Sequence, residues 1–274
     1  MAVPEAFFFE PIEALTDLGR TCAHDVPLLT AAPECGVRFF RPLPGRPRWK
    51  PPPPVLRSVW VVSPGWNQGP RFSGYRRLFE TQTEPSTWFA EADKTELFEL
   101  LAQGAEGLIL IGHGDEASRG FWLQGSVLVR FSELAEALSA SPAPLRFLYA
   151  FLCESAEAIY QDLLLPLARI GRLDRDFGAV LFLGSPLHDH GPFFLSELFK
   201  QLSAPATQRD PAPFLFALSR ARGALFQRAG LTEAVKPIAF VHRPQAHPWP
   251  PVEERRYLVA LARMLEPEGG KDGP

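Results

Sequence analysis

Between residues 58 and 241 the chain alternates short, continuous apolar runs with segments whose apolar positions recur every three or four residues. Continuous apolar runs are typical of strands buried on both faces of a parallel sheet. They predict strands at 58–63, 87–89, 108–111, 147–152, 179–183 and 238–241. The periodic segments predict helices beginning near Asp93 and spanning 132–138, 156–167, 193–202 and 214–226. This alternation indicates an α/β fold, in which helices cover both faces of a sheet dominated by parallel strands.

Local signals at element ends support this division. Asp93 is followed three residues later by Glu96, which predicts a helix N-cap with its reciprocal partner. The run FWLQGSVLV, centred on Gly125, predicts a small β-hairpin, and Ser132 stands where the next helix would open.

Proline divides the chain into three parts. Residues 42–54 read PLPGRPRWKPPPP, and this density of proline favours an extended linker over a helix or a central strand. We therefore expect an N-terminal appendage with its linker at 1–54, a main domain at 55–246, and a C-terminal helix with a disordered tail at 247–274. The appendage is too short for a core of its own, so we expect it to pack on the main domain.

Composition and charge exclude several classes of partner. The 274 residues carry a net charge of -3, which gives no overall attraction to nucleic acid or to an anionic membrane. No apolar stretch approaches the roughly 18 residues of a membrane helix, and the acidic start MAVPEAFFFEPIE lacks the basic residues of a secretory signal. A cytoplasmic protein is expected. Three cysteines in so long a chain argue against a disulfide framework and indicate that Cys153 is a free thiol.

Two of the predicted strands end in residues that carry chemistry. The run GLILIGHGDE delivers His113, and LRFLYAFLCESAEA delivers Cys153. Ligands and chemistry gather at the carboxyl ends of the strands in an open α/β sheet, so these side chains can meet there. The pair suggests a cysteine nucleophile with its base, and the helix after Cys153 favours the thiolate. The backbone N–H groups of Gly114 and Cys153 are candidates for an oxyanion hole.

Other interpretations of the same residues stay open. Cysteine is among the most buried residue types, so Cys153 at the end of an apolar run also fits a core residue, and a lone histidine is commonly structural. His188, Asp189 and His190 form a cluster that could ligate zinc, although structural zinc sites normally recruit four ligands with closely spaced cysteines. The alternative for this cluster is a polar loop without metal.

The order of motifs resembles the CHAT domain of caspase-like cysteine peptidases, the group that also includes separase. HGDE after an apolar strand, a hairpin, a helix and a strand ending in Cys are followed by GAVLFLGSPLHD and PFLFALSRARGAL, over roughly residues 56–243. The resemblance implies that His113 and Cys153 form the catalytic dyad. Two departures are clear: the usual tryptophan of the GSPLHD element is missing, and no tetratricopeptide repeats precede the domain.

This resemblance implies a caspase-like fold and a cysteine endopeptidase that cleaves a protein substrate without metal or organic cofactor. It also implies an activating or inhibitory protein partner and a role in bacterial antiviral defence or regulated death. In a peptidase, Asp115, Glu116, His188 and Asp189 would border the substrate pocket, and the negative charge of the three carboxylates would select a basic residue before the cleaved bond.

Two other functions remain as alternatives. One is a catalytically silent CHAT-like module that binds a protein through the same groove, and the other is a hydrolase on a doubly wound sheet that does not act on peptides. The exposed, basic linker at 42–54 is expected to be a site of proteolytic cutting or partner docking that switches activity.

Overall fold

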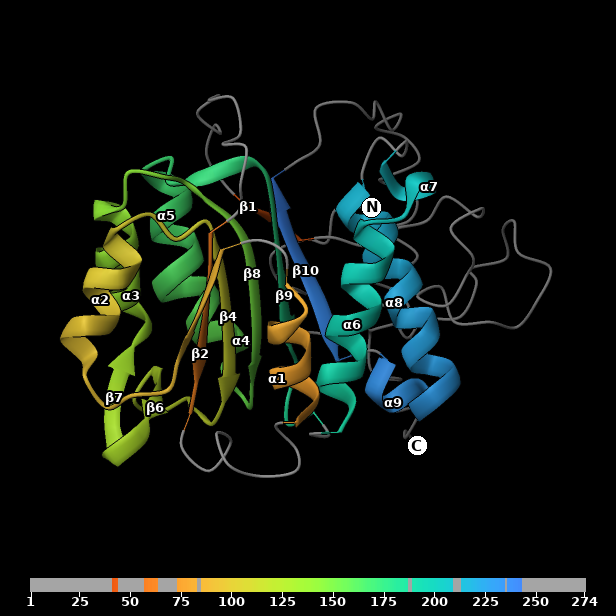
Figure 1. The fold of residues 1–274 in the computed structure, drawn as a ribbon, viewed down its shortest axis with the longest axis horizontal. Helices are drawn as coiled ribbons and strands as arrows, with labels where there is room; N and C mark the ends of the chain where they lie inside the picture. The colour runs from red at the N-terminus through yellow and green to blue at the C-terminus, as the bar shows by residue number, and fades with distance from the viewer. Residues whose placement is uncertain are drawn as a thin grey trace, which may run out of the picture.

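A seven-stranded sheet forms the centre of the computed structural model, which describes residues 41–43, 57–63, 73–82, 85–186, 189–208, 213–234 and 236–242. The strand order across the sheet is β1-β10-β9-β8-β4-β2-β3 (Figure 1). The strands are β1 (Arg41–Leu43), β2 (Ser58–Val62), β3 (Ser86–Phe89), β4 (Gly107–Gly112), β8 (Leu145–Leu152), β9 (Leu173–Phe182) and β10 (Pro237–His242).

Most neighbours in this sheet run parallel. Strands β3, β2, β4, β8 and β9 pair in parallel in that order. Strand β10 returns antiparallel to β9, and β1 pairs in parallel with β10 at the edge. The predicted fold class, a parallel-dominated sheet between helices, is therefore confirmed, with its last strand reversed. Strand β1 belongs to the segment predicted as an appendage, and it adds directly to the edge of the sheet.

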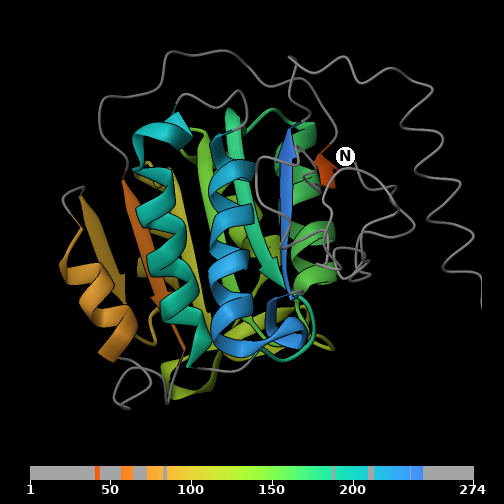
Figure 2. The same cartoon turned by 90° about the vertical axis from the view of Figure 1, so that its right-hand side faces the viewer.

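Helices cover both faces of the sheet. One face carries α2 (Lys94–Ala102), α3 (Phe131–Ala140), α4 (Ala156–Ile159), a π turn (Tyr160–Leu164) and α5 (Leu165–Arg169). The other carries α1 (Ser73–Glu80), α6 (His190–Leu202) and α8 (Pro213–Ala229), with the short α7 (Pro205–Gln208) and α9 (Leu231–Ala234) beside them. Figure 2 shows α6 and α8 lying side by side in front of the strands.

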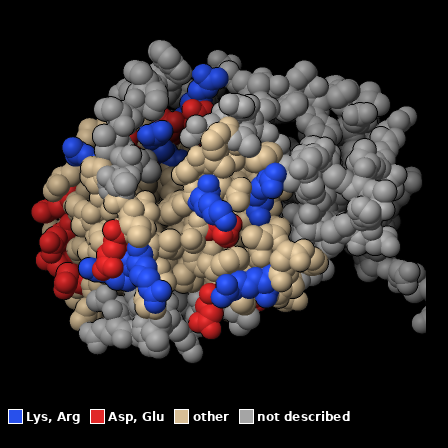
Figure 3. Space-filling model, turned by 45° about the vertical axis from the view of Figure 1, so that its right-hand side comes forward, with Lys and Arg blue, Asp and Glu red and all other residues tan. Residues whose placement is uncertain are grey.

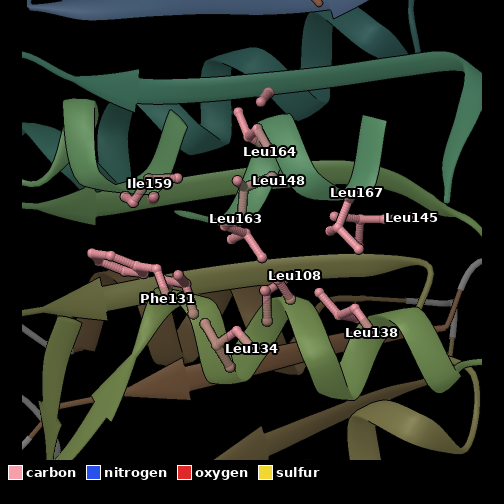
Figure 4. Packing of buried hydrophobic residues seen from close by; sticks show 14 of the residues in the cluster. Leu108, Phe131, Leu134, Leu138, Leu145, Leu148, Ile159, Leu163, Leu164 and Leu167 are labelled. Atoms are coloured by element: carbon pink, nitrogen blue, oxygen red, sulfur yellow. The ribbon is translucent and has the colours of Figure 1, made fainter. Parts of the chain in front are cut away.

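The face under α2, α3 and α5 is packed mainly with leucine. In Figure 4, Leu134 and Leu138 of α3 and Leu163 of the π turn converge on Leu108 and Leu148 of the central strands. All five side chains are buried, as the continuous apolar strands predict. This layer holds the helices that flank the carboxyl ends of β4 and β8.

The opposite face is aromatic, and two buried tyrosines tie its helices to the sheet. The Tyr149 hydroxyl of β8 donates to the Gly191 carbonyl in α6 at 3.1 Å and lies 3.5 Å from the Tyr75 hydroxyl of α1. Burial is the main cause that raises the pKa of both Tyr75 and Tyr149 above the usual phenol range. Both hydroxyls are therefore held neutral within the folded protein.

We expect stability to fall at alkaline pH because of this tyrosine pair. Unfolded tyrosines ionise near pH 10, whereas Tyr75 and Tyr149 stay protonated in the folded state, so stability is complete below about pH 10 and is lost as pH rises further. Tyr149→Phe should cost about 1 kcal/mol at pH 7, because the Gly191 carbonyl loses its donor. It should also reduce the alkaline slope by up to ~1.4 kcal/mol per pH unit, measured by urea unfolding between pH 7 and 11.5. An unchanged slope would contradict this account.

A three-stranded hairpin sheet follows β4 and comprises β5 (Gly114–Asp115), β6 (Gly120–Leu123) and β7 (Val127–Arg130). Strands β6 and β7 are the predicted hairpin, and Gly125 takes a positive φ of 70° in the turn between them. Strand β5 adds to β6 on the other side, immediately after His113. The hairpin therefore starts at one of the two candidate catalytic residues.

The helix predictions are largely confirmed, with informative differences. Asp93 caps α2 by accepting from the N–H groups of Thr95 and Glu96. Helix α3 begins one residue before Ser132, and the Glu133 carboxylate accepts from the N–H of Arg130 at 2.8 Å, so Ser132 is not the cap. The segment 156–167 is helical but is interrupted by the π turn, and α1 was not predicted from the sequence pattern.

The surface of the domain carries charges of both signs. Figure 3 shows described Lys and Arg side chains interspersed with Asp and Glu over one face. No helix among the described residues is long and apolar enough to cross a bilayer.

Candidate active site

Two adjacent strands bring His113 and Cys153 to the same level of the sheet. The last paired residues of β4 and β8 are Gly112 and Leu152, and His113 and Cys153 follow them directly. Neighbouring strands lie about 4.8 Å apart, so the two backbones leave the sheet side by side. His113 is exposed and Cys153 is partly exposed, so solvent reaches both residues. Cys153 is a free thiol, as predicted.

The backbone at Gly114 lies directly against the turn that carries Cys153. A Cβ atom placed on Gly114 would meet the Ser155 Oγ at 1.9 Å and the Cys153 carbonyl oxygen at 2.4 Å. Only glycine allows this approach. The buried Ser155 hydroxyl donates to the same Cys153 carbonyl at 2.8 Å. The two segments are thus in contact through backbone atoms.

The hairpin register sets the direction of the Gly114 N–H. The N–H of Trp122 donates to the His113 carbonyl at 3.4 Å, so Gly114 and Phe121 form a non-hydrogen-bonded pair. In such a pair, the N–H and C=O groups point away from the partner strand. The Gly114 N–H is therefore directed out of the hairpin, on the side away from β6.

The turn after Cys153 has an unusual backbone. Glu154 has a positive φ of 51°, and its N–H donates to the Gly184 carbonyl at 2.9 Å, which joins the turn to the end of β9. The exposed Glu154 carboxylate accepts from the Ser185 hydroxyl at 3.4 Å. The Glu154 N–H is therefore already hydrogen-bonded within the protein.

A buried serine stands at the end of the next strand. Ser63 follows β2, and its N–H donates to the Ile111 carbonyl at 2.9 Å. Its side chain fills the space beside Gly112, where an added Cβ would meet the Ser63 Cβ at 2.1 Å. Gly112 has a φ of 142°, which favours glycine. This close contact lets the chain turn toward His113.

The acidic candidates after His113 lie in the hairpin. The Asp115 carboxylate accepts from the Ser118 N–H at 3.0 Å, and this bond is the main cause that lowers the pKa of Asp115. Asp115 therefore closes the turn toward β6. Glu116 is exposed in that turn.

The candidates after β9 are only partly described. Asp189 is exposed and directly precedes α6, whereas His188 lies outside the described residues. Gly191 of α6 packs closely on Phe151, two residues before Cys153, so the beginning of α6 lies near the end of β8. Within the described part of the chain, no group of three or more His, Cys, Asp or Glu residues could hold a metal ion.

Several residues at this site were not predicted from the sequence. Ser63, Glu154 and Ser155 contact the two candidate segments, yet the sequence shows them as ordinary polar residues at strand ends. The tight turn at Cys153-Glu154-Ser155 could not be predicted from the sequence, because a positive φ at glutamate has no strong sequence signature.

A separate cavity of ≈ 560 Å³ opens toward the other end of the strands. Its wall includes Ser58 at the start of β2 and the rings of Trp60, Phe147, Phe199 and Phe214. Neither His113 nor Cys153 lines it. The cavity is therefore distinct from the candidate active site.

Comparisons with known proteins show a likeness of structure alone. No family model matches the sequence, and no curated protein matches it either. The structure is similar to that of the Arg-specific cysteine proteinase gingipain R (RgpB), with a TM-score of 0.50 and 11% identity over 69% of this chain and 46% of that chain. It also matches the complex of Porphyromonas gingivalis RgpB pro- and mature domains, with a TM-score of 0.49 and 12% identity over 69% and 47% of the two chains.

A third match is the Saccharomyces cerevisiae separase–securin complex, with a TM-score of 0.44 and 15% identity over 69% of this chain and 12% of that chain. The chain thus spans less than half of each of these neighbours. At such low identity, the likeness to gingipain R concerns the fold alone. The chain thus shares an α/β fold with gingipain R.

Proposed function

We propose that this protein is a cysteine endopeptidase with Cys153 as nucleophile and His113 as general base, within a CHAT-like domain. The observation that carries the proposal is the register of β4 and β8, which ends both strands at one level, so that His113 and Cys153 directly follow two neighbouring strand ends. The contact of Gly114 with the Cys153 carbonyl holds these strand ends together.

The proposed reaction proceeds through an acyl-enzyme. His113 takes the proton of the Cys153 thiol, and the sulfur attacks the carbonyl carbon of the substrate peptide bond. His113 then donates that proton to the leaving amine, which departs with the C-terminal part of the substrate. Water, deprotonated by His113, hydrolyses the thioester and releases the N-terminal part. All groups come from the protein and water, so the proposal requires no metal or organic cofactor.

The oxyanion hole is proposed to comprise the N–H groups of Gly114 and Cys153. Two features of the surroundings support this choice. The Gly114 N–H is directed out of the hairpin, and the neighbouring N–H of Glu154 is already bonded to Gly184. Fixed donors at the developing negative charge stabilise the transition state more than the substrate.

Acidic residues that follow strand ends of the sheet are the proposed contacts for substrate. They are Asp115, Glu116 and Asp189, with His188 as a further candidate from the sequence. Glu154 extends this set, because its carboxylate is exposed directly beside Cys153. The substrate is proposed to be a protein, and a protein partner is proposed to regulate the activity. The Asp115 carboxylate closes its own turn and the Glu154 carboxylate accepts from Ser185, so the exposed Glu116 and Asp189 are the stronger candidates.

A small alkylating reagent tests the dyad without knowledge of the substrate. In wild-type protein, His113 should raise the rate at which iodoacetamide modifies Cys153, because it withdraws the thiol proton. His113→Ala should slow this modification by about tenfold or more, measured by mass spectrometry of the peptide containing Cys153.

The control is modification in denaturant, where both proteins should react at equal rates. Equal rates in the folded proteins would contradict the dyad and favour a catalytically silent binding module. Cleavage of a peptide library by wild-type protein, and not by His113→Ala, would complete the assignment.

A further inference from the structure

We infer that Arg119 is a positioning residue that fixes the hairpin following His113 against the helical segment following Cys153. The inference rests on the proposed function, because the two segments that Arg119 joins directly follow the proposed catalytic pair in the chain. Arg119 acts through Asp162 and touches neither proposed catalytic side chain in any contact described above.

The contact is a two-pronged ion pair. The Arg119 Nε donates to Asp162 Oδ2 at 2.5 Å, and its Nη2 donates to Asp162 Oδ1 at 2.9 Å. The same Nη2 also donates to Gln161 Oε1 at 2.8 Å. Paired bonds of this kind fix direction as well as distance, unlike a single contact between flexible charges. An exposed ion pair with a single hydrogen bond commonly adds little to stability. The two-pronged geometry of the Arg119–Asp162 pair therefore indicates a role in orienting the two segments.

The ion pair is a second contact between the two segments that follow the candidate catalytic residues. Arg119 follows His113 by six positions, in the turn between β5 and β6. Asp162 follows Cys153 by nine positions, in the π turn between α4 and α5. Arg119 therefore lies in the hairpin that follows β4, and Asp162 lies in the helical segment that follows β8. Gly114 and Cys153 join these elements at the sheet, and the ion pair joins them again farther out.

Both partners occupy backbone that regular structure would avoid. Arg119 has a positive φ of 52°, which costs a residue other than glycine on the order of 1 kcal/mol. Asp162 lies in a π turn. This conformation is rare in proteins, and where it occurs it is often found at functional sites. The Arg119 carbonyl also accepts from the N–H of Phe131 at 3.0 Å, which anchors its turn to the start of α3. The strained turn is thus held at two points.

The predicted consequence of removing the pair is loss of alignment with retention of the fold. Arg119→Met keeps the length of the side chain and removes its donors. It should slow the His113-dependent alkylation of Cys153 about tenfold and lower kcat by about 100-fold, the effect of a misplacement near 1 Å. KM should change little, because no substrate contact is removed. Arg119→Lys keeps the charge but cannot form the two-pronged ion pair. Its alkylation rate and kcat should lie between those of the wild-type protein and those of Arg119→Met.

Two further variants make the test specific. The double variant R119D/D162R reverses the pair, and Asp tolerates a positive φ, so it should recover part of the lost alkylation rate. Lys94→Met is the control, because it breaks an ion pair of 2.6 Å between α2 and α3, together with the bond from Lys94 Nζ to the Leu128 carbonyl, and leaves the Arg119–Asp162 pair in place. That control should alkylate at the wild-type rate.

The outcomes separate this inference from the proposed function. Wild-type alkylation that equals that of His113→Ala would overturn the proposed function, and the positioning role with it. Wild-type alkylation faster than that of His113→Ala, with Arg119→Met equal to wild type, would overturn the positioning role alone. Slowed alkylation in Arg119→Met with recovery in the reversed pair would support it.

Discussion

Cys153→Ala should abolish peptide cleavage while leaving the fold intact. Loss of the sulfur removes covalent catalysis, and removal of a catalytic nucleophile commonly lowers kcat by ~10⁴-fold or more. The side chain is only partly buried and lies beyond the end of β8, so its loss should cost less than about 1 kcal/mol. Cleavage of a fluorogenic peptide library and thermal unfolding of the same samples measure both effects.

The interpretation of Cys153 as a core residue predicts the opposite pattern. A core thiol would leave a cavity when truncated, so stability would fall and any cleavage would persist. The combination of Cys153→Ala with His113→Ala adds a second criterion. The double variant should be no less active than either single variant, because groups that act as a unit lose activity together.

Gly114→Ala should damage both activity and stability. The added Cβ would overlap the Ser155 Oγ and the Cys153 carbonyl oxygen, so one of the two segments must move. Overpacking of this kind commonly costs about 1 to 3 kcal/mol. The displacement would also shift the proposed Gly114 oxyanion donor, with an expected loss of 10²-fold or more in kcat. Steady-state kinetics and urea unfolding provide the measurements.

Gly223→Ala is the matched control for this substitution. Gly223 lies within α8, and apart from its chain neighbours and the nearby backbone of that helix, no atom of the described residues lies within 4 Å of its added Cβ. Alanine in a helix is favoured over glycine by roughly 0.5 to 1 kcal/mol, so this variant should be slightly more stable and fully active. Equal behaviour of the two variants would show that the contact at Gly114 is dispensable.

The pattern of apolar residues alone was sufficient to predict the layered α/β fold. Continuous runs such as 108–111 and 147–152 are typical of strands covered on both sides, and the structure buries every residue from Gly107 to Gly112. The N-cap at Asp93 and the hairpin around Gly125 were equally predictable, because their signals are local. Each of these features depends on residues that are neighbours in the chain.

Sequence reasoning also placed His113 and Cys153 at strand ends, but it could not show that β4 and β8 are neighbours. That adjacency depends on strand order, which is decided by packing of helices from distant parts of the chain. The antiparallel direction of β10 and the addition of β1 at the edge of the sheet also depend on packing between distant parts of the chain.

The sequence by itself determined the fold class, the two strands that end in reactive residues, and the glycines beside His113, since periodicity and turn chemistry are local properties of the chain. Only the tertiary structure decided that Gly114 contacts Cys153 and that Arg119 meets Asp162 across 43 residues. Such contacts join segments that are remote in sequence, and no local preference of either segment encodes its partner. They arise when the sheet forms and brings the ends of its strands together.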